Sequence, residues 1–438
     1  MGDREVERRQ PPSGRSWWSR LARWPEELYR YWRGKRSGWR SSARLRRTAQ
    51  PMPTPTRSEL RALVAAWRSK RQPVRSTLSR LSREEESLLA DIRWRTAQAN
   101  RSNVMRTAAY LDFYRRCPEV HWALLAHMVS RNGGWNMTDL QGELLPRLLT
   151  EQQRQQTYQM LERANGLIFG DAYPQLLLYE LASQDRCDLQ RLLPGLGVSH
   201  FMAPVWSRFL EQRCSALLTT ALIVNEQHVI ELRVVNHPYY RTRVLDAFYF
   251  ELQAALQFNQ VVFPYSDEGE PLALAGLVLE DFTNIHERIE FGKRLYALLF
   301  GIPEVASGTL AFACRVAHSG SRADYAPYLF CRAAYGDREE ARYGERLHAL
   351  RLLEGAGRLR SPELAQAWPE RPLAPAEPGD WLSAARPGEL ARYFRRLPLP
   401  RSFVMTNEYG FALDKLELAV LAAEQMGMAP PGGTADDR

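Results

Sequence analysis

Two histidines and one arginine lie in the densest polar stretch of the sequence, residues 118–140. His121 and His127 belong to a segment that is apolar on nearly every side, which predicts a buried helix. Six residues separate them, so the imidazoles lie about 120° apart around the helix axis and are not expected to bind one metal ion together. Arg131 shares a face with His127. This pattern fits acid–base chemistry, and the competing interpretation is a core helix whose polar groups bond to one another.

The run Asn132-Gly133-Gly134 predicts the end of this helix, because glycine is typical of a helix C-terminus. Thr138 with Gln141 then predicts the start of the next helix. The amides of Asn132 and Asn136 would lie in or beside the turn, so we take both residues as candidates for binding a ligand.

Glu226 is the carboxylate most at odds with its surroundings. It lies on the apolar stripe of a helix predicted over 215–235, beside Asn225. An ionised Glu is costly to bury alone, so Glu226 must be paired or protonated. One interpretation is a structural ion pair with Arg106 or Arg131, and the other is a general base with a raised pKa. The candidate catalytic residues are Glu226, His127 and Arg131.

Two loops offer further polar groups. Residues 236–241 (NHPYYR) join two predicted helices, and residues 318–325 (HSGSRADY) follow another. Within the second loop, Ser321 with Asp324 forms a helix-capping pattern, which explains half of the cluster without any function. The remaining side chains suit a small anion. The candidate ligand-binding residues are Asn225, His121, Asn132, Asn136, His237, Tyr240, His318, Arg322 and Tyr325.

The sequence lacks the common catalytic signatures. It contains no G-x-x-x-x-G-K-[ST], no G-x-G-x-x-G, no G-x-S-x-G and no H-E-x-x-H. One E-x-x-H, at Glu345 and His348, falls short of the two that a di-iron bundle needs. The five cysteines include no C-x-x-C pair. We therefore predict no metal site and no cofactor.

The N-terminal region is basic and rich in tryptophan. Residues 1–50 carry 14 Lys and Arg and five of the twelve tryptophans, whereas residues 81–438 are net acidic. If residues 16–31 form a helix, Trp and Leu share one stripe with Arg off it, and Pro25 breaks or kinks the helix. Such a stripe is typical of helices on anionic membranes, Trp beside Arg also suits nucleic-acid bases, and a disordered tail is the alternative. The candidate surface residues are Trp17, Trp18, Arg20, Trp24 and Trp32.

Helical periodicity dominates the rest of the chain, and strand alternation is limited to residues 261–263 and 272–279. We expect an all-α, multi-helix bundle of more than ten helices with little or no sheet and a candidate division into two lobes near residue 200. Among the expected helices are 139–164, 174–184, 242–258 and 338–353. The expected organisation is a partly disordered basic extension and linker (1–56), a helical core (57–368), a Pro-rich linker (369–380), a C-terminal helical segment (381–428) and a disordered tail (429–438).

Several segments resemble one bacterial family. Residues 103–140 (NVMRTAAYLDFYRRCPEVHWALLAHMVSRNGGWNMTDL) are similar to the core of a Firmicutes family of unknown function typified by the Bacillus YppC-like proteins. IFGDAYPQLLLYE, ALIVNEQHVIELRVV, ERIEFGKRLYALLF and HSGSRADY are similar to its later blocks. The resemblance covers residues 90–330 and the segment 406–416. It implies a bacterial, cytoplasmic protein, assigns no activity, and leaves out the basic N-terminal region.

These observations favour a non-catalytic intracellular binding or scaffold protein. Its arm, residues 1–50, would associate with an anionic surface, a membrane in preference to nucleic acid, and the expected location is the cytoplasm or the inner face of the membrane. A small anionic ligand is a further candidate partner. The alternative is an enzyme of acid–base or hydrolytic type with an inter-helix pocket around Glu226, His127 and Arg131.

Overall fold

The computed structural model describes residues 24–70, 81–245, 259–266, 272–333 and 343–427. Fifteen α-helices lie within these described residues, and the structure has 65% helix and 6% strand. The prediction of an all-α bundle with more than ten helices and little sheet is therefore confirmed. The tail predicted over 429–438, most of the helix predicted over 242–258, and the candidates Trp17, Trp18 and Arg20 lie outside the described residues.

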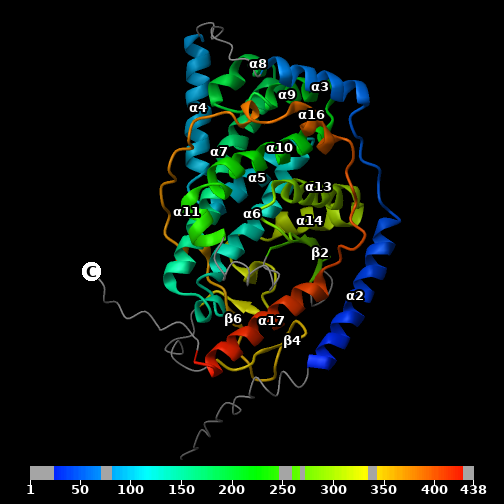
Figure 1. The fold of residues 1–438 in the computed structure, drawn as a ribbon, viewed down its shortest axis with the longest axis vertical. Coiled ribbons are helices and arrows are strands. Elements are labelled where there is room, and N and C mark those ends of the chain that lie inside the picture. The colour runs from blue at the N-terminus through cyan, green and yellow to red at the C-terminus, as the bar shows by residue number, and fades with distance from the viewer. Residues whose placement is uncertain (1–23, 71–80, 246–258, 267–271, 334–342, 428–438) are drawn as a thin grey trace, which may run out of the picture.

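The helices (Figure 1) are α2 Trp24–Arg46, α3 Arg57–Lys70, α4 Arg83–Ala99, α5 Asn103–Arg116, α6 His121–Asp139, α7 Glu151–Ser183, α8 Leu189–Leu192, α9 Met202–Gln212, α10 Ser215–Ile230, α11 Pro238–Tyr240, α13 Ile285–Gly301, α14 Pro303–Arg315, α15 Leu364–Ala367, α16 Pro387–Leu390 and α17 Thr406–Gln425. The strands are β1 Gln260–Ser266, β2 Ala273–Val278, β3 Phe330–Cys331, β4 Leu347–His348, β5 Arg351–Leu352 and β6 Leu359–Arg360. β1–β2 and β4–β5 are antiparallel pairs, and β3–β6 is a parallel pair. The β1–β2 pair contains both segments predicted as strands.

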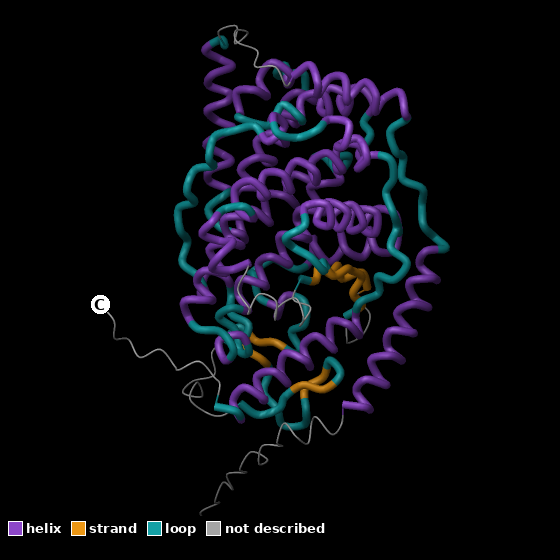
Figure 2. The backbone as a smooth tube through the Cα atoms, viewed as in Figure 1, coloured by secondary structure: helices purple, strands orange, loops and turns teal. Residues whose placement is uncertain are grey.

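Helix α6 is the central element of the core. It packs against α5, α7, α10, α13 and β1, and its buried side chains include Trp122, Met128 and Trp135. The buried apolar residues form one connected cluster that extends from Leu45 to Leu421. Figure 2 shows the helices around this centre and the short strands below it, toward the end of the molecule that α17 crosses.

Helix α7 is the longest element, with 33 residues, or about 50 Å at the usual rise per residue. It begins with a capping box between Thr150 and Gln153 and continues through Pro174. The separate helices predicted over 139–164 and 174–184 are therefore wrong. Leu176, Leu177 and Leu178, just after the proline, are fully buried, and this packing outweighs the ~3 kcal/mol that an internal proline costs.

The helix predicted over 338–353 is also wrong for its described part. Residues 347–352 form the β4–β5 hairpin, and its turn residues Ala349 and Leu350 have φ of 49° and 62°. Two successive left-handed residues reverse the chain, so no helix continues through them.

Within the described residues, no single helix has both the length and the apolar composition to cross a membrane. Helices α13 and α14 reach these limits only as a pair, and they are bent by 93° at the break between them.

Candidate functional site

Helix α6 does not end at its glycine pair, which corrects the turn predicted there. It continues through Gly133 and Gly134 to Asp139. A Cβ at Gly134 would lie 2.6 Å from Oδ1 of Asn103 and 2.7 Å from Nε2 of His318. The missing side chain therefore serves the close approach of α5 and the loop after α14 rather than helix termination.

His127 is held in the α5–α6 interface. Its Nδ1–H donates to the carbonyl oxygen of Thr107 at 2.7 Å, while Nε2 has no hydrogen-bond partner among the described residues. Burial lowers the pKa of His127 to about 3, and the nearby charge of Arg131 acts in the same direction. The imidazole is therefore neutral at physiological pH.

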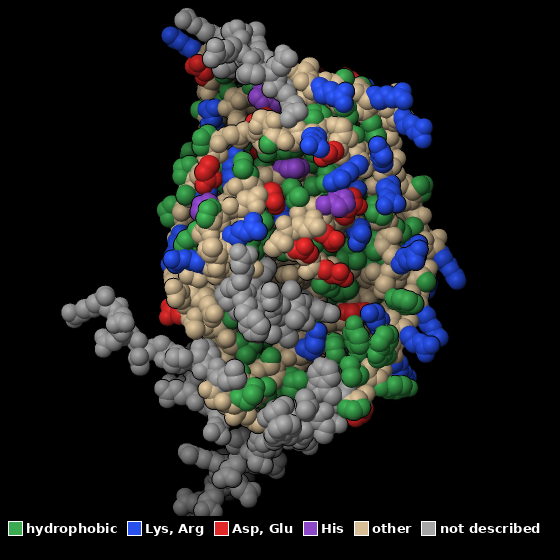
Figure 3. All heavy atoms as spheres, in the orientation of Figure 1, with side chains coloured by type: hydrophobic (Ala, Val, Ile, Leu, Met, Phe, Trp, Pro, Cys, Tyr) green, Lys and Arg blue, Asp and Glu red, His purple; other side chains and the backbone are tan. Residues whose placement is uncertain are grey.

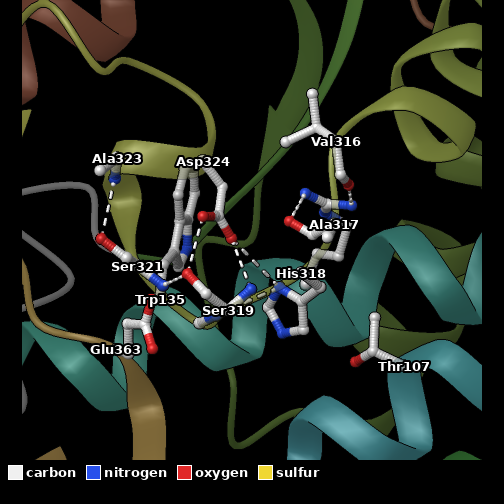
Figure 4. Close-up of polar contacts among 12 residues, drawn as sticks. Thr107, Trp135, Val316, Ala317, His318, Ser319, Ser321, Ala323, Asp324 and Glu363 are labelled. Atoms are coloured by element: carbon white, nitrogen blue, oxygen red, sulfur yellow. Dashed lines mark hydrogen bonds and ion pairs between the residues drawn. The ribbon is translucent and has the colours of Figure 1, made fainter. Parts of the chain in front are cut away.

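His318 lies against Gly134 of α6. Figure 4 shows the His318 ring beside Ser319 and Asp324 of its own loop. Because the amide nitrogen of Asn103 donates to Ser130, its Oδ1 accepts, so Nε2 of His318 carries the proton and donates at 2.9 Å. Nδ1 then accepts from the N–H of Gly320 and lies 3.7 Å from Oδ2 of Asp324. Burial lowers the pKa of His318 to about 4, so this ring is also neutral.

Asp324 organises the 318–325 loop. It accepts from the backbone N–H and hydroxyl of Ser319, both at 2.7 Å, and pairs with Arg332 at 2.7 Å. Ser321 caps the following turn by accepting from the N–H of Ala323, as its spacing predicts. The adjacent His318 ring and the donors of Ser319 and Arg332 together lower the pKa of Asp324 to about 2, outweighing the cost of burial. The loop's polar groups are thus largely used within the loop.

Arg131, predicted as a catalytic residue, and Arg322, predicted to bind an anion, both have partners within the protein. Arg131 donates to the carbonyl oxygens of Val316 and Ala317, just after α14, and its guanidinium lies 4.9 Å from the ring centre of Phe312. Arg322 forms a bidentate ion pair with the carboxylate of Asp139 through Nε and Nη2, and it also donates to the hydroxyl of Tyr409.

The phenol of Tyr325 lies nearby, packed against Trp135, and its buried oxygen has no hydrogen-bond partner in the described structure. The indole nitrogen of Trp135 is unpartnered in the same way.

The other candidates on α6 are held by backbone and ring contacts. The side-chain amide of Asn132 donates to the carbonyl oxygen of Val262 and accepts from the N–H of the same residue. It therefore forms the two hydrogen bonds to β1 that a neighbouring strand would form. His121 bonds the hydroxyl of Tyr296 and stacks on Phe300 at 4.0 Å. Asn136 lines a cavity of about 10 Å³, which is room for one water molecule.

Glu226 pairs with no arginine among the described residues, and the ion pair suggested with Arg106 or Arg131 is not formed. Its carboxylate accepts from the indole of Trp122 at 3.1 Å and from Gln227 at 3.3 Å. Burial raises the pKa of Glu226 to about 8, against which these two hydrogen bonds act. Arg106 instead binds Glu162 at 2.5 Å in the core.

Asp171 is a further candidate functional residue, which was not predicted from the sequence. The amide nitrogens of Asn225 and Gln175 both donate to its carboxylate, the latter at 3.0 Å. The amide oxygen of Asn225 in turn accepts from the indole of Trp381 at 2.9 Å. Burial raises the pKa of Asp171 to about 6. It lines a cavity of about 310 Å³ beneath residues 373–376. The sequence does place Asp171 and Gln175 one helical turn apart within an apolar run, and this spacing could have indicated that their side chains interact.

The polar side chains of the 236–241 loop mainly contact one another. Nδ1 of His237 accepts from the N–H of Tyr239 and so caps α11. Tyr240 lies beside the His237 ring and is half-buried, which raises its pKa.

The predicted residues therefore fall into separate groups. His127, Arg131 and His318 lie together around α6 and the 318–325 loop. Asn225 and Glu226 lie near Asp171, and their hydrogen bonds reach different side chains. The Asp171 cavity is lined by neither Glu226 nor His127. The common pocket expected for an enzyme is not formed by these contacts.

Within the part of the chain that the structure describes, no group of three or more His, Cys, Asp or Glu side chains is placed to hold a metal ion.

A different surface carries the strongest exposed feature, the outward side of α2. Its large apolar side chains are 38–68% exposed. The arginines beside them form no ion pair with a described residue, whereas Arg30 of the same helix pairs with Glu26. We call this surface the aromatic–basic face; it consists of Leu28, Tyr29, Trp32, Trp39, Arg33, Arg36, Arg40 and Arg46 of α2, together with Arg47 directly after the helix. Figure 3 shows Lys and Arg side chains along the right-hand edge of the molecule, where α2 and α3 lie.

The inward side of α2 fixes this helix to the body. Gly38 and Ser42 bring its backbone close to residues 403–404, and Ser42 Oγ accepts from the N–H groups of Phe403 and Val404, both at 3.0 Å. Tyr31 stacks on Phe411 of α17 at 4.3 Å. The described part of α2 begins at Trp24, so the residues before it lie outside the described part of the chain, and the break or kink predicted at Pro25 stays a prediction.

The chain is a helical-bundle protein of the family described as "Protein of unknown function (DUF2515)", which matches residues 98–391. It is 36% identical over 358 residues to the uncharacterized protein YppC of Bacillus subtilis, with 81% of this chain and 97% of that protein covered. The chain therefore belongs to this family, which confirms the resemblance. No solved structure matches. Helices α2 and α3 lie before the family match begins.

Proposed function

We propose that this protein binds an anionic membrane surface through the aromatic–basic face of α2 and acts there as a non-catalytic binding or scaffold protein, peripheral to the inner face of the membrane. One observation carries the proposal. Of the nine large hydrophobic side chains exposed in the described residues, four lie on this one helix. Exposed aromatics among cations are typical of helices that lie in a membrane interface.

The geometry of the face supports a flat, apolar partner. Trp32 and Trp39 are seven residues apart, two helical turns, so both indoles point to the same side. Leu28 lies one turn before Trp32 on that side and is suited to lipid, whereas it offers nothing to stack on a nucleic-acid base. Each arginine near an anionic surface contributes about 1 kcal/mol, so the face supplies both attraction and insertion.

Sedimentation of the full-length protein with lipid vesicles tests the proposal. We expect binding to phosphatidylcholine vesicles that contain phosphatidylglycerol, weaker binding to phosphatidylcholine alone, and release at high salt. The double variant Trp32→Ser/Trp39→Ser removes the apolar anchors. The double variant Arg36→Gln/Arg40→Gln is expected to weaken binding about tenfold or more.

Trp94→Ser is the matched control, because Trp94 is a 63% exposed tryptophan on α4, away from the proposed face. It should leave vesicle binding unchanged. Equal loss in this variant and in the α2 variants overturns the proposal, and so does equal binding to charged and neutral vesicles. A DNA-binding activity that is lost in the α2 variants, without any vesicle binding, assigns the face to nucleic acid instead.

A further inference from the structure

A groove lined by arginines lies between α3 and the segment that contains α16. Its volume is about 790 Å³, against about 310 Å³ for the cavity beside Asp171. Four arginines line it, three from α3 and one from beyond the short helix 391–394: Arg57, Arg61, Arg68 and Arg395. The lining between these cations is apolar and includes Leu60, Val64 and Ala391.

The sequence of α3 builds one wall of this groove. Arg57, Arg61 and Arg68 follow one another at four and seven residues, so their side chains share a face of the helix. The opposite face is fixed in the core, since Trp67 is fully buried, stacks on Phe201 and donates its indole N–H to the carbonyl of Phe201. The arginines are therefore presented by a rigid element.

None of the four guanidinium groups forms a hydrogen bond or ion pair with a described residue, and no carboxylate lines the groove. Other arginines at the surface do have carboxylate partners, since Arg116 pairs with Glu180 and Arg191 with Glu85. The nearest acids of the flanking helices are already engaged. Glu59 accepts from Thr56, and Glu389 pairs with Arg386. Four like charges thus face one hollow, and none of its described lining residues is a carboxylate that could balance them.

We infer that this groove binds a ligand that carries a phosphate group attached to an apolar group. Guanidinium groups bind phosphate oxygens in bidentate fashion, and several arginines around one hollow match the two negative charges of a phosphate monoester. Val64 and its apolar neighbours receive the rest of the ligand. The volume lies within the range of ligand clefts, roughly 300–1,000 Å³. This site is distinct from the face of α2, so it stands without the membrane proposal.

Calorimetry on the full-length protein tests this site with two probes. Phenyl phosphate represents a soluble phosphate ester, and dihexanoyl phosphatidic acid, used below its micelle concentration, represents a lipid headgroup. Binding of either supports the site, and the tighter one identifies the source. Arg61→Gln and Arg395→Gln should each weaken binding about tenfold, since a hydrogen bond to a charged group is worth about 1.5–3 kcal/mol.

Arg386→Gln is the control, because Arg386 is an exposed arginine near α16 that does not line the groove. The Arg386→Gln variant should bind both probes as tightly as the native protein does. Val64→Thr keeps the shape of the side chain and should weaken phenyl phosphate more than inorganic phosphate. The inference is overturned if neither probe binds, or if Arg386→Gln weakens binding as much as Arg61→Gln. Vesicle binding without probe binding would also overturn it, while leaving the α2 proposal intact.

Discussion

Gly134 lies directly beneath the imidazole of His318: a Cβ at this glycine would be 2.7 Å from both Cε1 and Nε2 of that ring. The ring is not free to move away, because Nε2 donates to Asn103 at 2.9 Å and Nδ1 faces Gly320 and Asp324. Helix α6, helix α5 and the loop after α14 meet at this point, so the contact holds three segments together.

Gly134→Ala is therefore expected to destabilise the protein by about 1–3 kcal/mol through overpacking. Gly133→Ala is a control on the next residue, because its Cβ meets Asn165 at only 3.4 Å, an ordinary contact. Replacing a helical glycine there should be neutral or stabilising by up to about 1 kcal/mol. Urea unfolding of both variants measures the difference. Equal stability of the two variants would contradict the role given to Gly134.

The buried pair of Arg106 and Glu162 is expected to be expensive to break. Their side chains are 1% and 9% exposed, so Glu162→Gln leaves the guanidinium without its counter-charge and should cost about 3 kcal/mol. Glu370→Gln is the comparison, because its partner Arg101 is 55% exposed and such pairs contribute about 0.5 kcal/mol. Similar unfolding midpoints for both variants would show that the buried pair adds nothing.

Stability should fall as pH rises, in part because of Glu226. Its pKa is raised to about 8 in the folded protein, so between the unfolded value near 4.5 and pH 8 the folded state holds the proton more tightly. The stabilisation is complete below pH 4.5 and is lost as pH rises through 8. Asp171 acts in the same direction, with a folded pKa of about 6.

Glu226→Gln keeps an acceptor for the indole of Trp122 and removes the titration. Unfolding free energies at pH 5, 6.5 and 8 should therefore decline less steeply in this variant, by up to about 4 kcal/mol over the range. Glu84→Gln, an exposed position on the first turn of α4, should keep the native slope. Parallel slopes for the native protein and Glu226→Gln would show that Glu226 is ionised throughout.

Ser42→Ala should loosen α2 from the body. The hydroxyl accepts from two backbone N–H groups, those of Phe403 and Val404, and burial leaves them no water to replace it. The expected cost is about 1–3 kcal/mol, confined to the docking of α2. Hydrogen exchange of the α2 amides should be faster in this variant and unchanged in Ser41→Ala. Unchanged exchange in both would mean that other contacts hold the helix.

The helical class and the β1–β2 pair were predictable because both follow from local periodicity, which residues 261–263 and 272–279 carry in their own side chains. The continuation of α6 through Gly133-Gly134 was not, since glycine is typical of helix ends and its actual role depends on His318, 184 residues further along the chain. Tertiary packing likewise carried α7 through Pro174.

The burial of several candidate side chains could be predicted from the sequence, whereas which of them lie together could not. The apolar surroundings of Glu226 left an ion pair and a raised pKa as alternatives, and burial raises its pKa. Its partner could not be inferred, because Trp122 and Gln227 look unremarkable in the sequence and the arginines found other acceptors. Asp171 lies between the helices predicted over 139–164 and 174–184, and its burial follows from the packing of α10 against α7, which the sequence does not show.

The length of α7 has a consequence for how this family can vary. One unbroken helix supplies Glu162 to α5, Asp171 to α10 and Gln175 to α9, each on a fixed rotational position. A single inserted residue near its start would turn everything beyond it by about 100° and displace all three partners at once. Relatives are therefore expected to tolerate exchanges along α7 one by one, while any change in its number of residues would have to come in whole turns or fall outside the helix.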